Sequence, residues 1–352
     1  MSKIKKEFLM GNEIIVQAAV RAGAQVLCGY PITPTTDILH YWLEVVDRNP
    51  KIFSRDNSFL QTEDEMAAGF AALGAILMGK VAFTATAGPG NVLMQDAFSM
   101  AENLRLPIVA VIGQRGGPST GTVIYSQQEL NLTCFGGNGE GLRIVYSPAT
   151  LDELYKAVGK AFEVAWKYRF PTFVLTDGYL CKAKGTFSPS PIKRVSGKAY
   201  FKPTSVLNLR NCYDQEEELG ELVSKNMAEF QKIAPEIAKF EEADFGEADV
   251  LVLAHGSVGE VAKLAVSAAQ SEGRRVNFWR PITLNPFPQQ ALEKAALKTE
   301  KILVVESSAG QFSKLIKQNL YNFPKPIFEF LKPAVGFDEE EILEKIREVG
   351  RG

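Results

Sequence analysis

Residues 80–113, KVAFTATAGPGNVLMQDAFSMAENLRLPIVAVIG, decide the fold. Two apolar runs of strand length, 80–87 and 107–113, enclose a stretch of helical length that begins at Pro89 and runs to about Leu104. Proline is well tolerated in the first turn of a helix. The run at 107–113 is apolar throughout, which is typical of strands that are covered on both faces. The segment therefore predicts a strand–helix–strand unit of a parallel sheet.

The same alternation continues on both sides of this unit. Further strands are predicted at 25–32, near 59–62, at 142–147 and at 171–177. Amphipathic helices are predicted over 12–23, 38–46, 64–78 and 150–168. The last of these helices opens with Thr150 and Glu153 at the spacing of a capping box. Strands and helices in alternation predict an α/β domain whose parallel sheet has helices on both faces.

The pattern divides the chain into three parts. Residues 1–182 form the predicted first domain, and residues 183–245 form a polar linker with a bracing helix that is interrupted near Pro235. Residues 246–352 form a smaller α/β domain. Its strands are predicted at 249–256, 275–281 and 301–307.

Composition excludes several classes of protein. Lys and Arg total 39 against 41 Asp and Glu, a net charge of −2, so no broad positive field is present to bind nucleic acid or an anionic membrane. The sequence contains no apolar run long enough to span a membrane and no signal peptide, which predicts a soluble, cytoplasmic protein. The four cysteines are scattered and do not predict a disulfide framework, a metal site or an iron–sulfur cluster held by this chain alone. They are Cys28, Cys134, Cys181 and Cys212.

Some familiar patterns nearly match and then fail. Residues 74–80 imitate a phosphate-binding loop, but Val81 replaces the required Ser or Thr and the intervening residues are apolar. Residues 255–259 have the wrong glycine spacing for a nucleophile elbow. His255 and His40 are the only histidines, and both favour a structural role over a catalytic one.

Four segments lie at the carboxyl ends of predicted strands, where open parallel sheets bind ligands. They are GYPITP (29–34), TEDE (62–65), TATAGPG (84–90) and QRGGPSTG (114–121). The two prolines around Thr33 either hold its hydroxyl for a ligand or simply stiffen a turn. Arg115 suits a substrate carboxylate, although a surface arginine in a loop is the alternative. Their shared edge of the sheet favours a ligand site.

In order and spacing, YPITPTT, TEDEMAAGFAALGA, TATAGPG and QRGGPSTG resemble the alpha subunit of 2-oxoacid:ferredoxin oxidoreductases. The resemblance is strong over about 10–180 and extends through PITLNPFP (281–288) and VVESSAGQ (304–311). It implies a pyrimidine-type thiamine diphosphate-binding domain followed by a smaller transketolase-C-terminal-like domain. The family uses thiamine diphosphate, coenzyme A and iron–sulfur clusters to decarboxylate 2-oxoacids and reduce ferredoxin.

The resemblance also implies roles for residues of this chain. Thr33 and Arg115 would bind the substrate, and Glu65 would be the catalytic carboxyl group, facing N1′ of the cofactor's aminopyrimidine, with Glu63 as the second candidate. A carboxyl group there favours the tautomer that takes the proton from the thiazolium ring. The other predicted cofactor contacts are Pro31, Ile32, Ala87 and Gly88.

The chain lacks the GDG-and-Asn pattern that commonly holds Mg²⁺ and the diphosphate of thiamine diphosphate. Residues 176–178 and 137–140 come nearest and do not complete it. The resemblance therefore implies a beta subunit that carries Mg²⁺, the diphosphate site and an iron–sulfur cluster. Gamma and ferredoxin-like delta subunits are further expected partners, and no metal ligand is expected in this chain.

The substrate stays open among related 2-oxoacids. Residues 114–130 and 136–140 look closer to the 2-oxoglutarate branch, whereas the chain length also suits branched-chain enzymes, and pyruvate is a further alternative. Residues 122–125 are more apolar than a pocket for a second carboxylate would require. Outside this class, the alternatives are another thiamine enzyme, a non-catalytic nucleotide- or acyl-CoA-binding protein, and a subunit retained only for assembly.

Overall fold

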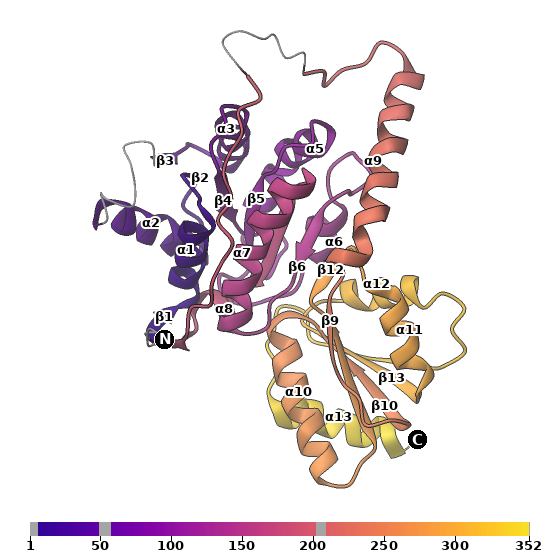
Figure 1. The fold of residues 1–352 in the computed structure, drawn as a ribbon. Helices are drawn as coiled ribbons and strands as arrows, with labels where there is room; N and C mark the ends of the chain where they lie inside the picture. The colour runs from indigo at the N-terminus through magenta and orange to yellow at the C-terminus, as the bar shows by residue number, and fades with distance from the viewer. Residues whose placement is uncertain (1–5, 49–57, 202–208, 352) are drawn as a thin grey trace.

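A computed structural model describes residues 6–48, 58–201 and 209–351. The parts of the predicted domains and linker at residues 1–5, 49–57, 202–208 and 352 lie outside the described residues. Figure 1 shows two α/β domains, the first drawn in indigo to magenta and the second in orange to yellow. The long helix α9 (Glu216–Ile237) stands beside both of them.

Among the described residues, seven strands form the first sheet in the order β12-β6-β7-β5-β4-β2-β3. The strands are β2 (Val26–Gly29), β3 (Ser58–Gln61), β4 (Ala82–Thr86), β5 (Val109–Gln114), β6 (Ile144–Tyr146), β7 (Thr172–Asp177) and β12 (Thr283–Asn285). Every neighbouring pair is parallel except β12 with β6. The apolar strands β4, β5 and β7 are buried along their whole length, which confirms the prediction of a sheet covered on both faces.

Helices pack on both faces of this sheet. One core contains α1 (Gly11–Ala22), α2 (Thr36–Arg48) and α7 (Leu151–Tyr168). The other contains α3 (Glu65–Leu77) and α5 (Gln95–Asn103). Three shorter helices, α4 (Pro89–Leu93), α6 (Leu130–Phe135) and α8 (Gly178–Lys182), lie at the carboxyl ends of strands. The helix predicted from Pro89 to about Leu104 is therefore two helices, α4 and α5, which meet at Met94.

Local signals place several helix ends where the sequence predicts them. Gly23 ends α1 with φ at 98°, a left-handed conformation that glycine adopts at little cost. The Thr150 hydroxyl accepts a hydrogen bond from the Glu153 backbone N–H at the start of α7. The Glu153 carboxylate reaches Ala149 N instead of Thr150 N, so half of the predicted capping box is present.

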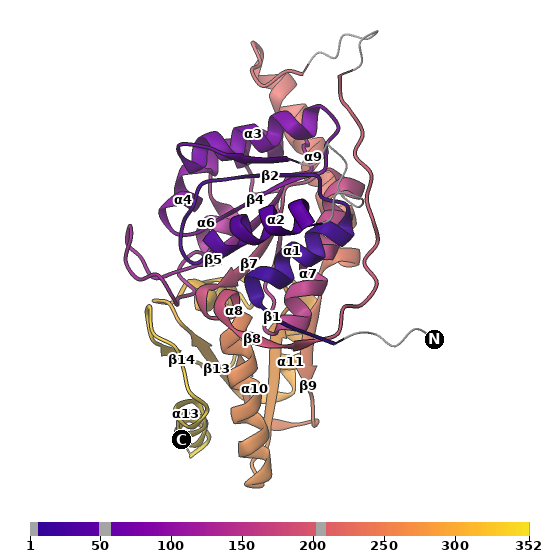
Figure 2. The ribbon, with the colours of Figure 1, turned by 90° about the vertical axis from the view of Figure 1, so that its left-hand side faces the viewer.

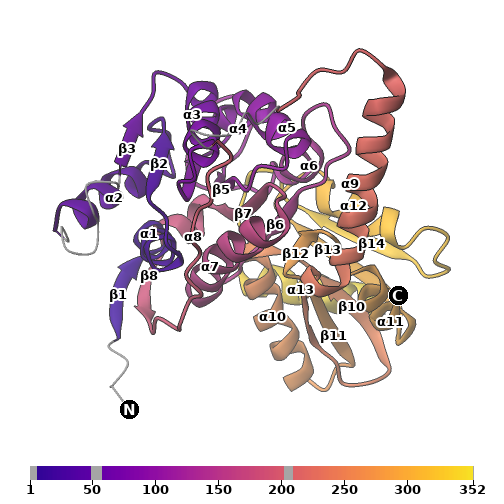
Figure 3. The ribbon, with the colours of Figure 1, turned by 45° about the horizontal axis from the view of Figure 1, so that its top comes forward.

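The second sheet has the order β14-β13-β10-β11-β9 among the described residues. Its strands are β9 (Phe240–Ala243), β10 (Ala248–Leu253), β11 (Val276–Pro281), β13 (Thr299–Glu306) and β14 (Ile327–Leu331). One face packs against α10 (Gly256–Ser271) and α13 (Glu339–Arg351), and α11 (Gln289–Leu297) and α12 (Gln311–Asn319) cover the other. Figure 3 shows this second domain beside the first one.

The segment that connects the two domains packs along the first domain. After β8 (Lys184–Phe187) pairs with β1 (Glu7–Met10), the chain runs up the whole first domain before α9 returns to the second (Figures 1 and 2). Backbone hydrogen bonds from Val195 to Ala22 and from Tyr200 to Leu77 fix this ascending segment. Helix α9 continues through Pro235, so the interruption predicted there is wrong. Pro235 has no N–H to donate to the preceding turn, but the helix ends two residues later.

The two domains share a sheet edge and a hydrophobic core. Strand β9 lies inside the stretch 183–245 that the sequence assigns to the linker, yet it pairs with β11 in the second sheet. Strand β12 comes from the second half of the chain and covers the β6 edge of the first sheet. One hydrophobic core joins α3 and α5 to the inner face of the second sheet. In the part of the chain that the structure describes, no helix has the length and apolar character to cross a membrane.

Candidate active site

The carboxyl ends of β2, β4 and β5 are neighbours in the first sheet, so the segments that follow them meet at one edge. The turn after β2 carries Thr33, the turn after β4 carries Gly88, and Arg115 directly follows β5. Glu65 opens α3 after β3. The structure therefore brings the predicted site residues to a common edge, as parallel topology requires.

Arg115 lies across this edge and is held by the turn after β2. Its Nη1 donates a hydrogen bond of 2.8 Å to the carbonyl oxygen of Thr33. The side chain is buried, yet its Nε has no hydrogen-bond partner among the described residues. The Nε lies against Gly88 and keeps a hydrogen-bonding capacity that the described residues do not use.

The Thr33 side chain itself is exposed, with Pro31 and Ile32 half-buried before it. The Thr35 hydroxyl donates a hydrogen bond to the carbonyl oxygen of Ile32 and closes the turn. The predicted pair Thr33 and Arg115 is thus in contact, although through the threonine backbone and not through its hydroxyl. The hydroxyl remains open to a ligand.

Glu65 is the first residue of α3 and is only 5% exposed. Asp64 caps the helix by accepting a hydrogen bond from Ala67 N, which leaves the Glu65 side chain to point away from the helix end. Burial raises the pKa of Glu65, the nearby charge of Asp64 adds to that rise, and Arg115 opposes it. Glu63 is exposed, so of the two carboxyl groups considered from the sequence, Glu65 is the one that lies in the site.

The turn after β4 lies against both Glu65 and Arg115. A methyl group built on Gly90 would lie 2.6 Å from Glu65 Oε1 and would also overlap the Thr86 hydroxyl. One built on Gly88 would lie 2.7 Å from Arg115 Nε. Gly88 also has φ at 53° and ψ at −121°, where side chains are strained. The glycines therefore allow the turn to pack directly against a buried carboxyl group and a guanidinium.

Glu129, which sequence reasoning missed, ties this edge together. Its Oε1 accepts backbone hydrogen bonds from Gly88 N at 2.8 Å and Arg115 N at 3.1 Å, and its Oε2 accepts one from Asn91 Nδ2 at 2.9 Å. Burial raises the pKa of Glu129, and these hydrogen bonds oppose the rise. A lone carboxylate in a loop carries no local pattern that would have predicted these contacts.

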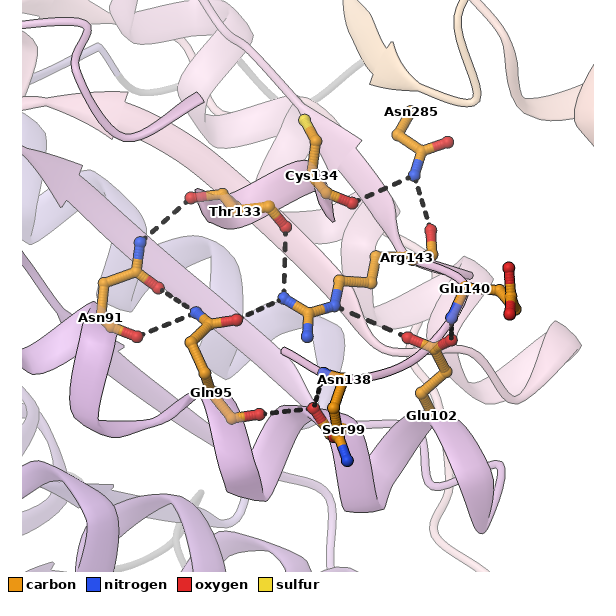
Figure 4. Close-up of polar contacts among 11 residues, drawn as sticks. Asn91, Gln95, Ser99, Glu102, Thr133, Cys134, Asn138, Glu140, Arg143 and Asn285 are labelled. Carbon is orange, nitrogen blue, oxygen red and sulfur yellow. Dashed lines mark hydrogen bonds and ion pairs between the residues drawn. The ribbon is translucent and has the colours of Figure 1, made fainter. Parts of the chain in front are cut away.

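A buried polar network continues from Asn91 away from the edge (Figure 4). Gln95 donates hydrogen bonds to Asn91, and its Oε1 accepts one of 2.8 Å from Arg143 Nη1. Arg143 is fully buried, and its Nε lies 3.7 Å from Glu102 Oε2. Glu102 Oε1 in turn accepts a hydrogen bond from Glu140 N, in the glycine-rich loop 136–141. The network anchors that loop to α5.

We expect Arg143→Lys to destabilise the chain by about 2 kcal/mol, because one ammonium group cannot reproduce the contacts of a fixed guanidinium fork. Thermal or urea unfolding of the purified chain measures the change. Arg275→Lys is the matched control, since Arg275 forms an exposed ion pair with Asp249 and the same exchange there is expected to alter stability by less than about 0.5 kcal/mol. Equal effects of the two substitutions would contradict a stabilising role for the buried network.

The remaining sequence candidates take structural positions. His255 is fully buried before α10, its Nδ1 lies 3.0 Å from the Ser147 hydroxyl, and burial lowers its pKa to about 3. Asp177 caps α8 and accepts a hydrogen bond from the Ser257 hydroxyl. The phosphate-loop imitation at 74–80 begins inside α3. Within the described ranges, no group of three or more His, Cys, Asp or Glu side chains is arranged to hold a metal ion.

Comparison with known families agrees with this geometry. The family described as pyruvate flavodoxin/ferredoxin oxidoreductase, thiamine diphosphate-binding, matches residues 17–215, more than half of the chain. The chain belongs to the 2-oxoacid:ferredoxin oxidoreductases, as an alpha subunit. Core domain II of pyruvate:ferredoxin oxidoreductase matches residues 248–339. The family and the α/β fold predicted from the sequence are thereby confirmed.

Individual relatives carry two kinds of name. The 2-oxoglutarate synthase subunit KorA of Methanocaldococcus jannaschii is 32% identical, over 88% of this chain and 90% of that protein. The KorA of Archaeoglobus fulgidus is 30% identical, over 90% and 92%. The ketoisovalerate oxidoreductase subunit VorB of Methanothermobacter thermautotrophicus is also 30% identical, over 97% of each chain. This oxidoreductase subunit thus has relatives named for both 2-oxoglutarate and ketoisovalerate.

Solved structures place the fold in the same group. A 2-oxoglutarate:ferredoxin oxidoreductase from Magnetococcus marinus, solved with 2-oxoglutarate, coenzyme A and succinyl-CoA, is 26% identical with a TM-score of 0.87. The match covers 99% of this chain and 66% of that one. A split-gene transketolase is 15% identical with a TM-score of 0.60 over 97% of this chain and 98% of that one, and it shares the fold alone.

Proposed function

We propose that this chain supplies the aminopyrimidine and substrate side of a thiamine diphosphate site, for the CoA-dependent oxidative decarboxylation of a 2-oxoacid with ferredoxin as acceptor. A partner beta subunit would hold Mg²⁺, the diphosphate and an iron–sulfur cluster. The observation that carries the proposal is the pairing of a buried carboxyl group, Glu65, with the buried guanidinium of Arg115 around the turn at Gly88–Gly90. The bound cofactor would supply the electron sink for decarboxylation.

The residues of the site fit that cofactor. Glu65, whose pKa is raised by burial, would donate a hydrogen bond to N1′ of the aminopyrimidine and exchange a proton there. Pro31, Ile32, Ala87 and Gly88 would pack against its rings. Gly88 and Gly90 let the turn approach Arg115 and Glu65 more closely than a residue with a side chain could. The buried Thr86 hydroxyl has no hydrogen-bond partner among the described residues and lies beside Gly90.

The substrate would be bound through its carboxylate. Arg115 has an Nε without a hydrogen-bond partner among the described residues while its Nη1 holds the Thr33 carbonyl, so its guanidinium would bind a carboxylate once the adjoining turn at Gly88 makes room. The exposed Thr33 hydroxyl is the second donor for the carboxylate or the keto oxygen. The charge-assisted hydrogen bonds of a guanidinium are suited to orienting a 2-oxoacid.

We propose 2-oxoglutarate as the substrate, in line with the sequence pattern around Arg115 and with the names of the KorA relatives. A branched-chain 2-oxoacid is the second candidate. Val123 and Ile124, in the loop after Arg115, are 44% and 59% exposed and would suit an aliphatic side chain better than a second carboxylate.

We expect the isolated chain to show no turnover and the complex with its beta partner to reduce a viologen or ferredoxin. The reason is that the described residues contain no metal-binding cluster and no cysteine set for electron transfer. The assay compares the lone chain with the co-purified complex on pyruvate, 2-oxoglutarate and 2-oxoisovalerate. Turnover by the lone chain would contradict the shared site, and a preference for 2-oxoisovalerate would select the second candidate.

A further inference from the structure

The segment Ser126–Asn131 lies between the two domains and is held from the second one. Gln127 N donates to the Ser307 carbonyl oxygen at 3.0 Å, and Ser307 N donates to Gln127 Oε1 at 3.0 Å. The other end of the Gln127 amide donates to the His255 carbonyl oxygen at 2.7 Å. Gln127 is fully buried, and its backbone N–H and both polar atoms of its side chain bind residues that follow β10 and β13.

The same segment is fixed again at Gln128 and Asn131. Gln311 of α12 donates to the Gln128 carbonyl oxygen at 2.7 Å and accepts a hydrogen bond of 3.0 Å from Asn131 N. Within the described residues, five hydrogen bonds from backbone and side chains thus join Gln127, Gln128 and Asn131 to the second domain. Their number and burial leave the segment little freedom.

Between these fixed points, Glu129 points the other way, into the edge of the first sheet. One of its carboxylate oxygens accepts the backbone N–H groups of both Gly88 and Arg115, which follow β4 and β5. Its own N–H donates to Gln114 Oε1 at 3.2 Å. A single oxygen atom therefore binds the turn after β4, which contains Gly88 and is called the cofactor turn below, and also binds Arg115.

The chemistry of this contact requires a carboxylate. Two N–H groups converge on Oε1 and the Asn91 amide donates to Oε2, so all three neighbours are donors. Glu129 is 5% exposed, and water cannot replace a lost acceptor there. An amide of the same size would present hydrogen atoms to at least one of these donors.

We propose that Glu129 is a positioning residue for the active site, and that the second domain holds it in place through Gln127. The inference rests on the proposed function, because Gly88 and Arg115 are the residues that it positions. It gives the second domain a role in substrate binding, although the five hydrogen bonds described above end on Gln127, Gln128 and Asn131 and not on Gly88 or Arg115.

The test is Glu129→Gln in the assembled complex. We expect KM for the 2-oxoacid to rise about 10-fold and kcat to fall no more than about 3-fold, because Arg115 is displaced while Glu65 is untouched. A role limited to folding would lower the yield of complex and leave KM unchanged. Glu13→Gln is the control: this carboxylate also accepts a backbone hydrogen bond, from Met10 N, but at the start of α1.

A double-mutant cycle with Arg115→Gln tests whether Glu129 acts through Arg115. We expect the double variant to be no worse in kcat/KM than Arg115→Gln alone within about 3-fold. If the fold-changes in kcat/KM of the two single variants multiply in the double variant, the proposal is overturned. Gln127→Ala removes the two side-chain hydrogen bonds to Ser307 and His255, so it is expected to raise KM about 3-fold. It keeps the idea testable if Glu129→Gln does not assemble, and an unchanged KM would refute the part assigned to the second domain.

Amide hydrogen exchange gives a readout that needs no substrate. In the Glu129→Gln complex, exchange at Gly88 and Arg115 is expected to be at least about 10-fold faster than in the parent, and Glu13→Gln is expected to leave it unchanged. If the parent complex turns over no 2-oxoacid, the proposed function fails while the exchange result still reports on positioning. Unchanged exchange together with an unchanged KM would overturn the inference.

Discussion

Glu65→Gln is expected to reduce turnover of the assembled complex by at least about 10³-fold, while thiamine diphosphate binding and subunit assembly stay close to those of the parent. Glutamine keeps the size of the side chain and can still donate a hydrogen bond to a ring nitrogen. It cannot exchange a proton, and proton exchange at N1′ is the role that the proposed function gives to Glu65. Burial, which raises the pKa of this carboxyl group, keeps a transferable proton on it at higher pH than usual.

The measurement combines steady-state assays with cofactor binding by calorimetry on the apo-complex. Glu63→Gln is the matched control, because Glu63 is two residues away, carries the same functional group and is exposed. It is expected to retain activity within about 2-fold. Near-normal turnover in Glu65→Gln would remove the proposed role, and a loss confined to Glu63→Gln would transfer it to the neighbouring carboxyl group.

The sequence was sufficient to predict the edge of the sheet but not the contacts made there. Apolar runs locate β4 and β5, and parallel pairing then requires that Gly88 and Arg115 lie side by side. The choice between Glu63 and Glu65 needs the register of α3, which begins at Glu65 because Asp64 is its cap. That register depends on which side of the helix packs against α5, a tertiary contact.

Long-range contacts explain what sequence reasoning missed. Glu129 lies 41 residues from Gly88 in the chain, and no periodicity links the two. Strand β12 leaves the second half of the chain to cover the β6 edge of the first sheet, since an unpaired edge would expose its backbone groups. Such contacts arise when preformed elements pack, so local propensity does not encode them.

Arg115→Gln is expected to lower kcat/KM for the 2-oxoacid by about 10²- to 10⁴-fold, mainly through KM. Each hydrogen bond between charged partners contributes about 1.5–3 kcal/mol, and the substitution removes the guanidinium that would supply two of them. The buried Nε beside Gly88 has no partner in the described residues, so its loss costs the folded chain little. The variant also loses the hydrogen bond from Nη1 to the Thr33 carbonyl and the favourable charge of Arg115 near Glu65 and Glu129.

A second substitution separates the loss of charge from the loss of that native contact. Arg115→Lys keeps a positive charge but presents no fork, and we expect it to recover no more than about 10-fold of the lost kcat/KM. Thermal unfolding of both variants should stay within about 2 °C of the parent, because the Thr33 turn is also closed by Thr35. A parent-like KM in Arg115→Gln would show that the substrate carboxylate is bound elsewhere. In that case Glu129 would position only the turn that contains Gly88. In the double-mutant cycle, the effects of Glu129→Gln and Arg115→Gln on kcat/KM would then be independent.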